Sequence, residues 1–311
     1  MVRFLLTRFF QSILVLLSVT FISFTLIKLS PADYFEQFKL NPQISPETIQ
    51  KLRKMYGLDD PLLLQYFKWL TAALRFDLGI SLQYNTPVTD LIRERIGKTL
   101  ALTVPSAVIS WVAASFLGLL AGFREGTWID RAVRIFSYTF MSMPSFFLAF
   151  ILLFFLARGG YLQPGGTSSL LVGITTLSLI STAGLVRLMR SAVIEVLHSP
   201  TVVMLRAKGA TTGVMMKHVV RNAMNPFITL IGYEIAGLIS GAALIEVVVG
   251  WPGLGELMLN AVLSQDLFLV MGGLYIGTIM LIVGNLIADI ILALVDPRVR
   301  EKEIKLKEVK L

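Results

Sequence analysis

The sequence predicts an all-α, polytopic integral membrane protein with about six transmembrane helices. Of its 311 residues, 55% are hydrophobic and 15% are charged, whereas a soluble domain carries about 25% charged residues. The mean hydropathy is +0.74. Six apolar runs are long enough to cross about 30 Å of hydrocarbon. These runs are Phe9–Leu29, Leu100–Gly122, Ala132–Leu156, Ser168–Val186, Phe227–Val249 and Phe268–Val295.

The first run predicts an uncleaved membrane anchor. Phe9–Leu29 follows Arg3 and Arg8 as a secretion signal would, but it exceeds the apolar region of about 7–15 residues that such signals contain. The residues after it do not form a small-x-small cleavage site. We therefore expect residues 1–30 to form an N-terminal tail and the first transmembrane helix.

The distribution of basic residues predicts that both termini are cytoplasmic. Lys and Arg cluster between the fourth and fifth runs and in the tail, residues 296–311, whereas the loop Trp251–Leu267 has neither. Basic residues mark cytoplasmic loops, which accounts for the net charge of +8 without nucleic-acid binding. Residues 31–99 carry both signs of charge, and a segment this long is translocated largely regardless of charge.

That outer segment is predicted to be a small helical cap. Ser45-Pro46-Glu47 has the pattern of a helix N-terminus, with a cap, a proline and a first-turn acid, and Gly57 is a stop signal. Pro61 opens a second helix. Thr86-Pro87 opens a third, whose apolar stripe of Leu91, Ile92 and Ile96 leads into the second span.

The sequence offers no catalytic or metal-binding constellation. Gly97-Lys98-Thr99 resembles the end of a phosphate-binding loop, but Ile92 stands where that loop needs glycine. His198 and His218 lack neighbouring carboxylates at ligand spacing, and the chain contains no cysteine. We therefore predict that this chain has no catalytic residues and binds no metal or cofactor itself.

Acidic and small residues inside the spans are candidates for a pathway or for packing. A carboxylate in hydrocarbon costs about 2.5–3.5 kcal/mol by insertion scales. Glu246 and Asp289 lie near span ends, where solvation explains them. Glu234 lies deeper and is the better pathway candidate, although a structural carboxylate is an equal alternative. Close helix packing is predicted at the glycine pairs 118/122, 237/241 and 273/277.

The stretch 187–226, between the fourth and fifth spans, has the most distinctive pattern. His198-Ser199-Pro200 breaks the helix that carries Arg187 and Arg190. A short helix over Val202–Lys208 should then stop at Gly209, and the next should end before Pro226. These helices carry basic residues together with apolar ones such as Val203, Met204 and Met216. They indicate a docking surface for a soluble partner or an amphipathic helix that rests on lipid head groups.

Several motifs in one order resemble a known permease family. Arg206-Ala207-Lys208-Gly209-Ala210 followed by Arg221-Asn222-Ala223-Met224-Asn225-Pro226 resembles the cytoplasmic loop of ABC importer permeases. The chain is similar, more narrowly, to the first permease subunit of the dipeptide/oligopeptide/nickel family. The other supporting motifs are Leu29-Ser30-Pro31-Ala32-Asp33, Tyr56-Gly57-Leu58-Asp59-Asp60-Pro61, Asp77-Leu78-Gly79-Ile80-Ser81, Trp128-Ile129-Asp130-Arg131, Met143-Pro144-Ser145-Phe146, Trp251-Pro252-Gly253-Leu254-Gly255 and Asp296-Pro297-Arg298. Two departures are the apolar Val203-Met204-Leu205, where the loop's name-giving residues would stand, and a short outer loop at Ala157–Thr167.

The resemblance implies a type I ABC importer permease fold, with a permease core at residues 100–295 in a prokaryotic inner membrane. Its implied partners are a second, related permease subunit, two cytoplasmic ATPases that hold ATP and Mg, and an extracytoplasmic solute-binding protein. The implied solutes are peptides, with nickel complexes or sugars as further options. The implied ATPase-coupling residues are Val203, Met204, Leu205, Arg206, Ala207, Lys208, Gly209, Ala210, Asn222 and Pro226.

A pathway or gate is expected at three further places. Met143, Pro144 and Ser145 should break or bend the third span, as proline does in membrane helices. Trp251, Pro252 and Gly253 form a gate, a binding-protein contact or a plain interfacial turn. Glu234 is the third candidate. The alternative function is a stand-alone secondary transporter or channel, for which inverted repeats would be the sign, and none is visible; an intramembrane enzyme would need a catalytic pair in the bilayer.

Overall fold

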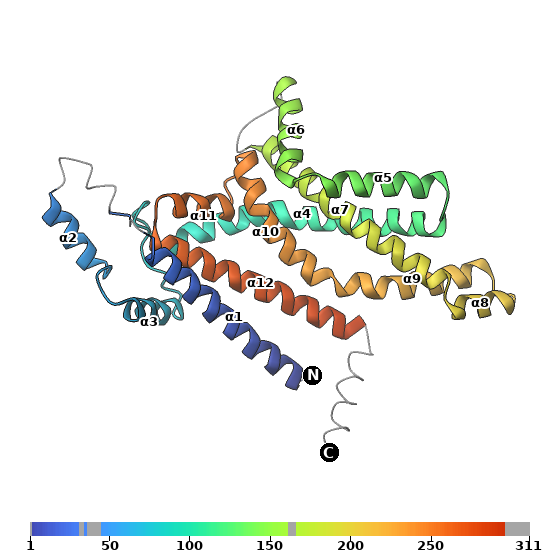
Figure 1. Ribbon diagram of the computed structural model, residues 1–311, viewed down its shortest axis with the longest axis horizontal. Helices are drawn as coiled ribbons and strands as arrows, with labels where there is room; N and C mark the ends of the chain where they lie inside the picture. Colours follow the sequence, from blue (N-terminus) through green and yellow to red (C-terminus); the bar gives the residue numbers. More distant parts are fainter. Residues whose placement is uncertain (1, 31–33, 36–44, 161–165, 296–311) are drawn as a thin grey trace, which may run out of the picture. The chain divides into compact units, whose positions relative to one another are not determined.

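The computed structural model describes residues 2–30, 34–35, 45–160 and 166–295 (Figure 1). Within those ranges all long regular elements are helices, and one isolated antiparallel bridge joins Ile80 to Pro87. The chain forms two compact units, residues 1–99 with 252–282 and residues 100–251 with 283–311. Helices α4 (Val88–Phe123) and α12 (Leu267–Val295) each pass from one unit into the other.

The first unit contains α1 (Val2–Lys28), α2 (Pro46–Met55), α3 (Leu62–Ala73), α11 (Leu254–Leu263) and the first parts of α4 and α12. The predicted start of α2 is confirmed, because Ser45 Oγ accepts from the Thr48 amide at 3.2 Å and Pro46 occupies the first turn. Gly57 follows at φ +67°, in the left-handed conformation that glycine adopts at helix ends.

Long-range polar contacts hold this unit together. Asp266, just before α12, is fully buried. Its carboxylate accepts from Ser81 Oγ at 2.6 Å, from the Gln83 amide at 3.0 Å and from the Leu269 amide at 3.1 Å. The segment before α4 is thereby fixed to the N-terminus of α12. Thr99 Oγ1 similarly accepts from the Leu254 amide at 2.8 Å, which anchors the start of α11.

The second unit is organised around α7 (Thr167–Leu197), which packs against α5 (Trp128–Ser142), α6 (Ser145–Arg158), α9 (Thr212–Thr229) and α10 (Ile231–Val249). The predicted packing role of one glycine pair is confirmed. A Cβ added at Gly118 or at Gly122 would lie 2.6 Å from the side chain of Met189 or Val193 on α7. Among described residues, nothing lies within 4 Å of a Cβ at Gly237 or Gly277, so the other two pairs do not act as pairs within this chain.

The spans are less regular than hydropathy predicts. In the described part of the chain, four helices are long and apolar enough to cross a membrane, and two bent helix pairs bring the number to six if each pair is one span. The third predicted span, Ala132–Leu156, is one of these pairs, because the chain turns by 100° between α5 and α6. The predicted break at Met143-Pro144-Ser145 is confirmed. Met143 is extended at ψ 129° and Pro144 is the N-cap of α6, since proline lacks the amide that would continue α5.

One boundary prediction is wrong. The helix expected to end before Pro226 continues as α9 to Thr229, breaks at Leu230 and resumes as α10. A membrane helix tolerates proline where its neighbours compensate for the lost hydrogen bond, so the sequence rule that stops helices at proline fails here. The predicted loop Trp251–Leu267 is confirmed in its bounds, since α10 ends at Val249 and α12 begins at Leu267, and the structure adds a short helix inside it, α11.

The expectation that solvation explains Glu246 is also wrong. This residue lies one turn from the end of α10, yet it is 0% exposed. The chain turns back immediately after α10, at Gly250 with φ +64°, and the Trp251 amide bonds to the Glu246 carbonyl at 2.8 Å. A position near a span end is therefore buried in the structure, where solvation cannot account for its charge. The side chain of Asp289 lies outside the described residues.

Candidate coupling surface

The predicted short helix exists as α8 (Pro200–Ala207), and the sequence explains both of its ends. Ser199 is its N-cap, with Oγ 3.5 Å from the Val202 amide, and Pro200 follows in the first turn. The same Oγ donates to the Val196 carbonyl at 2.7 Å. Ser199 therefore links the last turn of α7 to the first turn of α8, which is the predicted break at His198-Ser199-Pro200.

Gly209 ends α8 as predicted. It lies at φ +74°, a backbone region that residues with a Cβ rarely adopt. The Gly209 amide bonds to the Arg206 carbonyl and the Ala210 amide bonds to the Leu205 carbonyl, both at 3.0 Å. This pair of bonds is a Schellman motif, which satisfies the last carbonyls of a helix and reverses the chain. The α8–α9 turn is therefore held by backbone geometry.

One side of α8 anchors it and the rest is exposed. Val202 is 1% exposed and packs in the second unit's core with Val219 of α9. Val203 and Met204 are 60% and 50% exposed. Arg206, Ala207, Lys208 and Gly209 are also exposed, whereas Leu205 and Ala210 are half-buried. We call residues 203–210 the coupling surface.

The remaining coupling candidates lie on α9, along with further apolar and basic groups. Val214 and Met216, in its first turns, are 53% and 45% exposed. Asn222 is half-buried, and its Nδ2 donates to the His218 carbonyl at 2.7 Å, so it is occupied within its own helix. Pro226 lies inside α9, and its side chain is outside the described residues. Residues 199–226 contain four Lys or Arg and no Asp or Glu.

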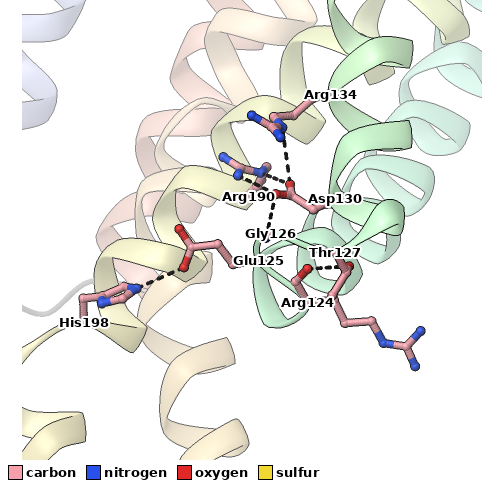
Figure 2. Close-up of polar contacts among 8 residues, drawn as sticks. All are labelled: Arg124, Glu125, Gly126, Thr127, Asp130, Arg134, Arg190 and His198. Atoms are coloured by element: carbon pink, nitrogen blue, oxygen red, sulfur yellow. Dashed lines mark hydrogen bonds and ion pairs between the residues drawn. The ribbon is translucent and has the colours of Figure 1, made fainter.

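An ion-pair cluster connects the end of α7 to the turn between α4 and α5 (Figure 2). Asp130, in the first turn of α5, is 1% exposed at its side chain and lies between Arg190 of α7 and Arg134. Arg190 makes a two-point contact with it, of which the Nη2–Oδ2 bond measures 3.0 Å. The Gly126 amide donates to the same carboxylate at 3.0 Å.

A second, exposed pair lies beside α8. His198, at the end of α7, is 3.0 Å from Glu125 in the α4–α5 turn, with side chains 70% and 44% exposed (Figure 2). Both pairs join the same two segments. They tie the α7–α8 corner to the start of α5 by one buried ion pair and one exposed pair.

The predicted pathway residues occupy separate places. Met143, Pro144 and Ser145 form the sharp turn between α5 and α6, while Trp251, Pro252 and Gly253 connect α10 to α11. Trp251 is half-buried against the packing of α6 and α10. The side chain of Glu234 lies outside the described residues, so its orientation stays a prediction.

Sequence reasoning missed the Asp130–Arg190 pair as a structural link. The signals were present: Asp130 belongs to the quoted Trp128-Ile129-Asp130-Arg131 motif, and Arg190 was noted as a basic residue at a helix end. Their separation of 60 positions hid the contact, because helical periodicity relates only residues three or four apart.

Comparison with known proteins identifies the family. Residues 114–301 match the binding-protein-dependent transport system inner membrane component, and residues 1–103 match the N-terminal component of such transport membrane proteins. The chain belongs to this family of inner-membrane permeases. The permease is therefore a multi-pass membrane protein and a transport component of an ABC importer.

Full-length relatives and one solved structure support the same assignment. The permease is 32% identical to the oligopeptide transport system permease protein AppB of Bacillus subtilis, over 96% of its own length and 99% of AppB. It is 31% identical to the metal-staphylopine import system permease protein CntB of Staphylococcus aureus, over 97% and 99%. A crystal structure of an amino acid ABC transporter with histidines matches at a TM-score of 0.56 and 16% identity, over 66% of the permease and 94% of that chain. This last likeness supports the fold.

Proposed function

We propose that the coupling surface inserts into a groove on a cytoplasmic ATPase subunit and transmits its ATP-driven motion. The observation that carries this proposal is the exposure of Val203 and Met204 on a short helix that is capped at Ser199 and Gly209. Exposed apolar side chains on a rigid element are typical of an interaction site. A helix that only rested on lipid would not need both ends fixed.

The charge of the segment indicates the chemistry of the partner surface. Residues 199–226 carry Arg206, Lys208, Lys217 and Arg221 with no carboxylate. We expect an apolar groove with an acidic rim on the ATPase, contacted at its edge by Arg206 and Lys208. Motion of α8 would reach α7 through Ser199 and α5 through Arg190 and Asp130.

The rest of the assembly follows from the family. ATP and Mg are held by two ATPase subunits, so this permease contributes half of a pore and no catalytic group. We propose a heterodimer with a second, related permease, both termini in the cytoplasm, and a solute-binding protein outside. The Trp251–Gly253 turn contacts that binding protein or gates the pathway, and the α5–α6 turn and Glu234 border the pathway.

We propose peptides as the solute class. One full-length relative carries the name oligopeptide permease, and another is named for import of metal-staphylopine. Selection among them would rest mainly with the binding protein.

A charge placed on the coupling surface tests the proposal. In proteoliposomes containing the full transporter, Met204→Glu should reduce ATP-driven uptake at least 10-fold, because it buries a carboxylate in an apolar groove whose rim is acidic. Leu63→Glu is the matched control, since Leu63 is 57% exposed on α3, in the other unit, compared with 50% for Met204.

Gly209→Glu should abolish uptake while leaving membrane insertion intact. Normal ATP-driven uptake by Met204→Glu would refute the assignment, and uptake by this chain without ATPases would support a stand-alone transporter.

A further inference from the structure

A cavity of about 710 Å³ opens between α5 and α7. Helix α5 contributes Arg134 and Tyr138 to its wall, and α7 contributes Arg187 and Arg190. Leu230, at the break between α9 and α10, lines it as well. All of these residues belong to the second unit. The volume falls within the range of ligand pockets, about 300–1,000 Å³, and the proposed function does not account for the basic residues in the wall.

Positive charge in this cavity is not fully neutralised. Three guanidinium groups line it, and no Asp or Glu is among the described residues of the wall. The carboxylate in contact with these groups is that of Asp130, which pairs with Arg190 and lies 3.8 Å from Arg134. Arg187 is exposed and makes no ion pair within the described structure. The cavity therefore favours an anion.

The donors are accessible on both helices. The side chain of Arg134 is 45% exposed and makes no hydrogen bond to Asp130 at its distance of 3.8 Å. Figure 2 shows Arg134 and Arg190 on two sides of Asp130. Tyr138 is 57% exposed and Ser191 is exposed, and both add a hydroxyl group to the wall. Guanidinium groups match the geometry of phosphate and carboxylate oxygens, so either anion fits the donors alone.

The depth of the arginines distinguishes between these anions. The apolar run Ser168–Val186 ends one residue before Arg187, and about 20 helical residues cross the hydrocarbon. Arg187 therefore lies where hydrocarbon meets the lipid head groups. Ile180, about two turns deeper on α7, lines the same cavity with Leu185. A phospholipid carries a phosphate and an acyl chain in this order, whereas a small carboxylate would leave the apolar wall uncovered.

We infer that this cavity binds the phosphate group of an anionic phospholipid. Arg187 donates to its oxygens from α7 and Arg134 from α5, while an acyl chain lies against the apolar wall. Basic pockets between membrane helices bind the head groups of anionic lipids in this way. The bound phosphate joins α5 to α7 beside the Asp130–Arg190 pair. The site goes beyond the proposed function and depends neither on the solute nor on the ATPase.

Native mass spectrometry of the purified full-length permease tests the site by counting bound lipids. One phosphatidylglycerol should be retained in preference to phosphatidylcholine, because choline would place a positive charge among the arginines. Arg187→Gln should weaken this binding about 10-fold, since it removes charge-assisted hydrogen bonds. Arg134→Gln should produce a similar loss from the other helix. Arg124→Gln is the matched control, because Arg124 is exposed in the α4–α5 turn and its side chain points away from Asp130 (Figure 2).

Three competitors separate the sources of the anion. A diacylglycerol with the same acyl chains lacks the phosphate and should not displace phosphatidylglycerol. Glycerol 3-phosphate carries the head group without the chains and should not displace it at the same concentration. Displacement by glycerol 3-phosphate would make a free phosphate compound the ligand, and displacement by trialanine would assign the cavity to a peptide carboxylate. Either result would overturn the inference, as would equal retention of phosphatidylglycerol by the parent, Arg187→Gln and Arg134→Gln.

A stability measurement separates lost binding from lost structure. Without added lipid, Arg187→Gln should unfold at the same temperature as the parent, because Arg187 has no partner to lose within the described structure. Added phosphatidylglycerol should raise the unfolding temperature of the parent and of Arg124→Gln, since a ligand that binds only the folded state stabilises it. The rise should be smaller in Arg187→Gln. An equal rise in all three proteins would place the lipid elsewhere and reject the site.

Discussion

Two buried aspartates, one in each unit, are stabilised in opposite ways. Asp130 in the second unit pairs with the guanidinium of Arg190, and its side chain is 1% exposed. Asp266 in the first unit is 0% exposed, and its hydrogen-bond partners among the described residues are neutral, one hydroxyl and two backbone amides. One carboxylate thus joins two helices by charge, and the other joins a loop to a helix N-terminus by hydrogen bonds and the helix dipole.

Under the coupling proposal, we expect this difference to separate an element that transmits motion from one that holds a shape. The Asp266 carboxylate accepts hydrogen bonds from two backbone amides, so its position is fixed by the backbone around it. Asp130 is held to α7 through the long side chain of Arg190. We expect the first arrangement to be rigid and the second to follow movements of α7 and α8.

The largest effect should come from removing one partner of the ion pair. Asp130→Ala leaves Arg190 only partly solvated, at 18% exposure, and breaking a buried pair in this way costs about 3–5 kcal/mol. Thermal unfolding of the purified permease in detergent should show the loss. The exchange Asp130→Arg with Arg190→Asp should recover part of it. An Asp130→Ala protein as stable as the parent would mean that the pair does not bind the two helices.

An intermediate effect is expected at Asp266. Asp266→Ala removes the acceptor for three donors and the N-terminal cap of α12, which should cost about 1–3 kcal/mol. Asp266→Asn keeps one acceptor oxygen but turns an NH₂ toward the donors, so it should lie between the parent and the alanine variant. The same unfolding assay ranks the three proteins. If asparagine proved as stable as aspartate, the negative charge beside the helix N-terminus would contribute nothing.

Most of the fold was predictable because its signals are local. Helix ends at Ser45, Ser199 and Gly209 follow from short motifs whose geometry each residue type dictates. The positions of the spans follow from the length of apolar runs. The break at Pro144 followed from the same kind of rule.

The failures share a cause, which is packing between distant segments. Pro226 lies inside a helix and Glu246 is buried near a span end, and neither is visible in a local pattern. Gln65 and Trp69 were not singled out in the sequence, and only the tertiary structure shows that each, within the described residues, has a buried polar atom without a hydrogen-bond partner. The coupling surface itself was located by motif, while its link to α5 through Asp130 was not.

The smallest effect should come from the exposed pair of Glu125 and His198, which joins the same two segments as Asp130 and Arg190. Both side chains are largely solvated, at 44% and 70% exposure, so their attraction is screened and worth at most about 1 kcal/mol. Glu125→Gln should therefore leave the unfolding temperature nearly unchanged. The parent and Glu125→Gln should also respond alike to added salt. A destabilisation comparable to that of Asp130→Ala would show that this corner depends on the outer pair as well, and the contrast between a buried link and a solvated one would no longer hold.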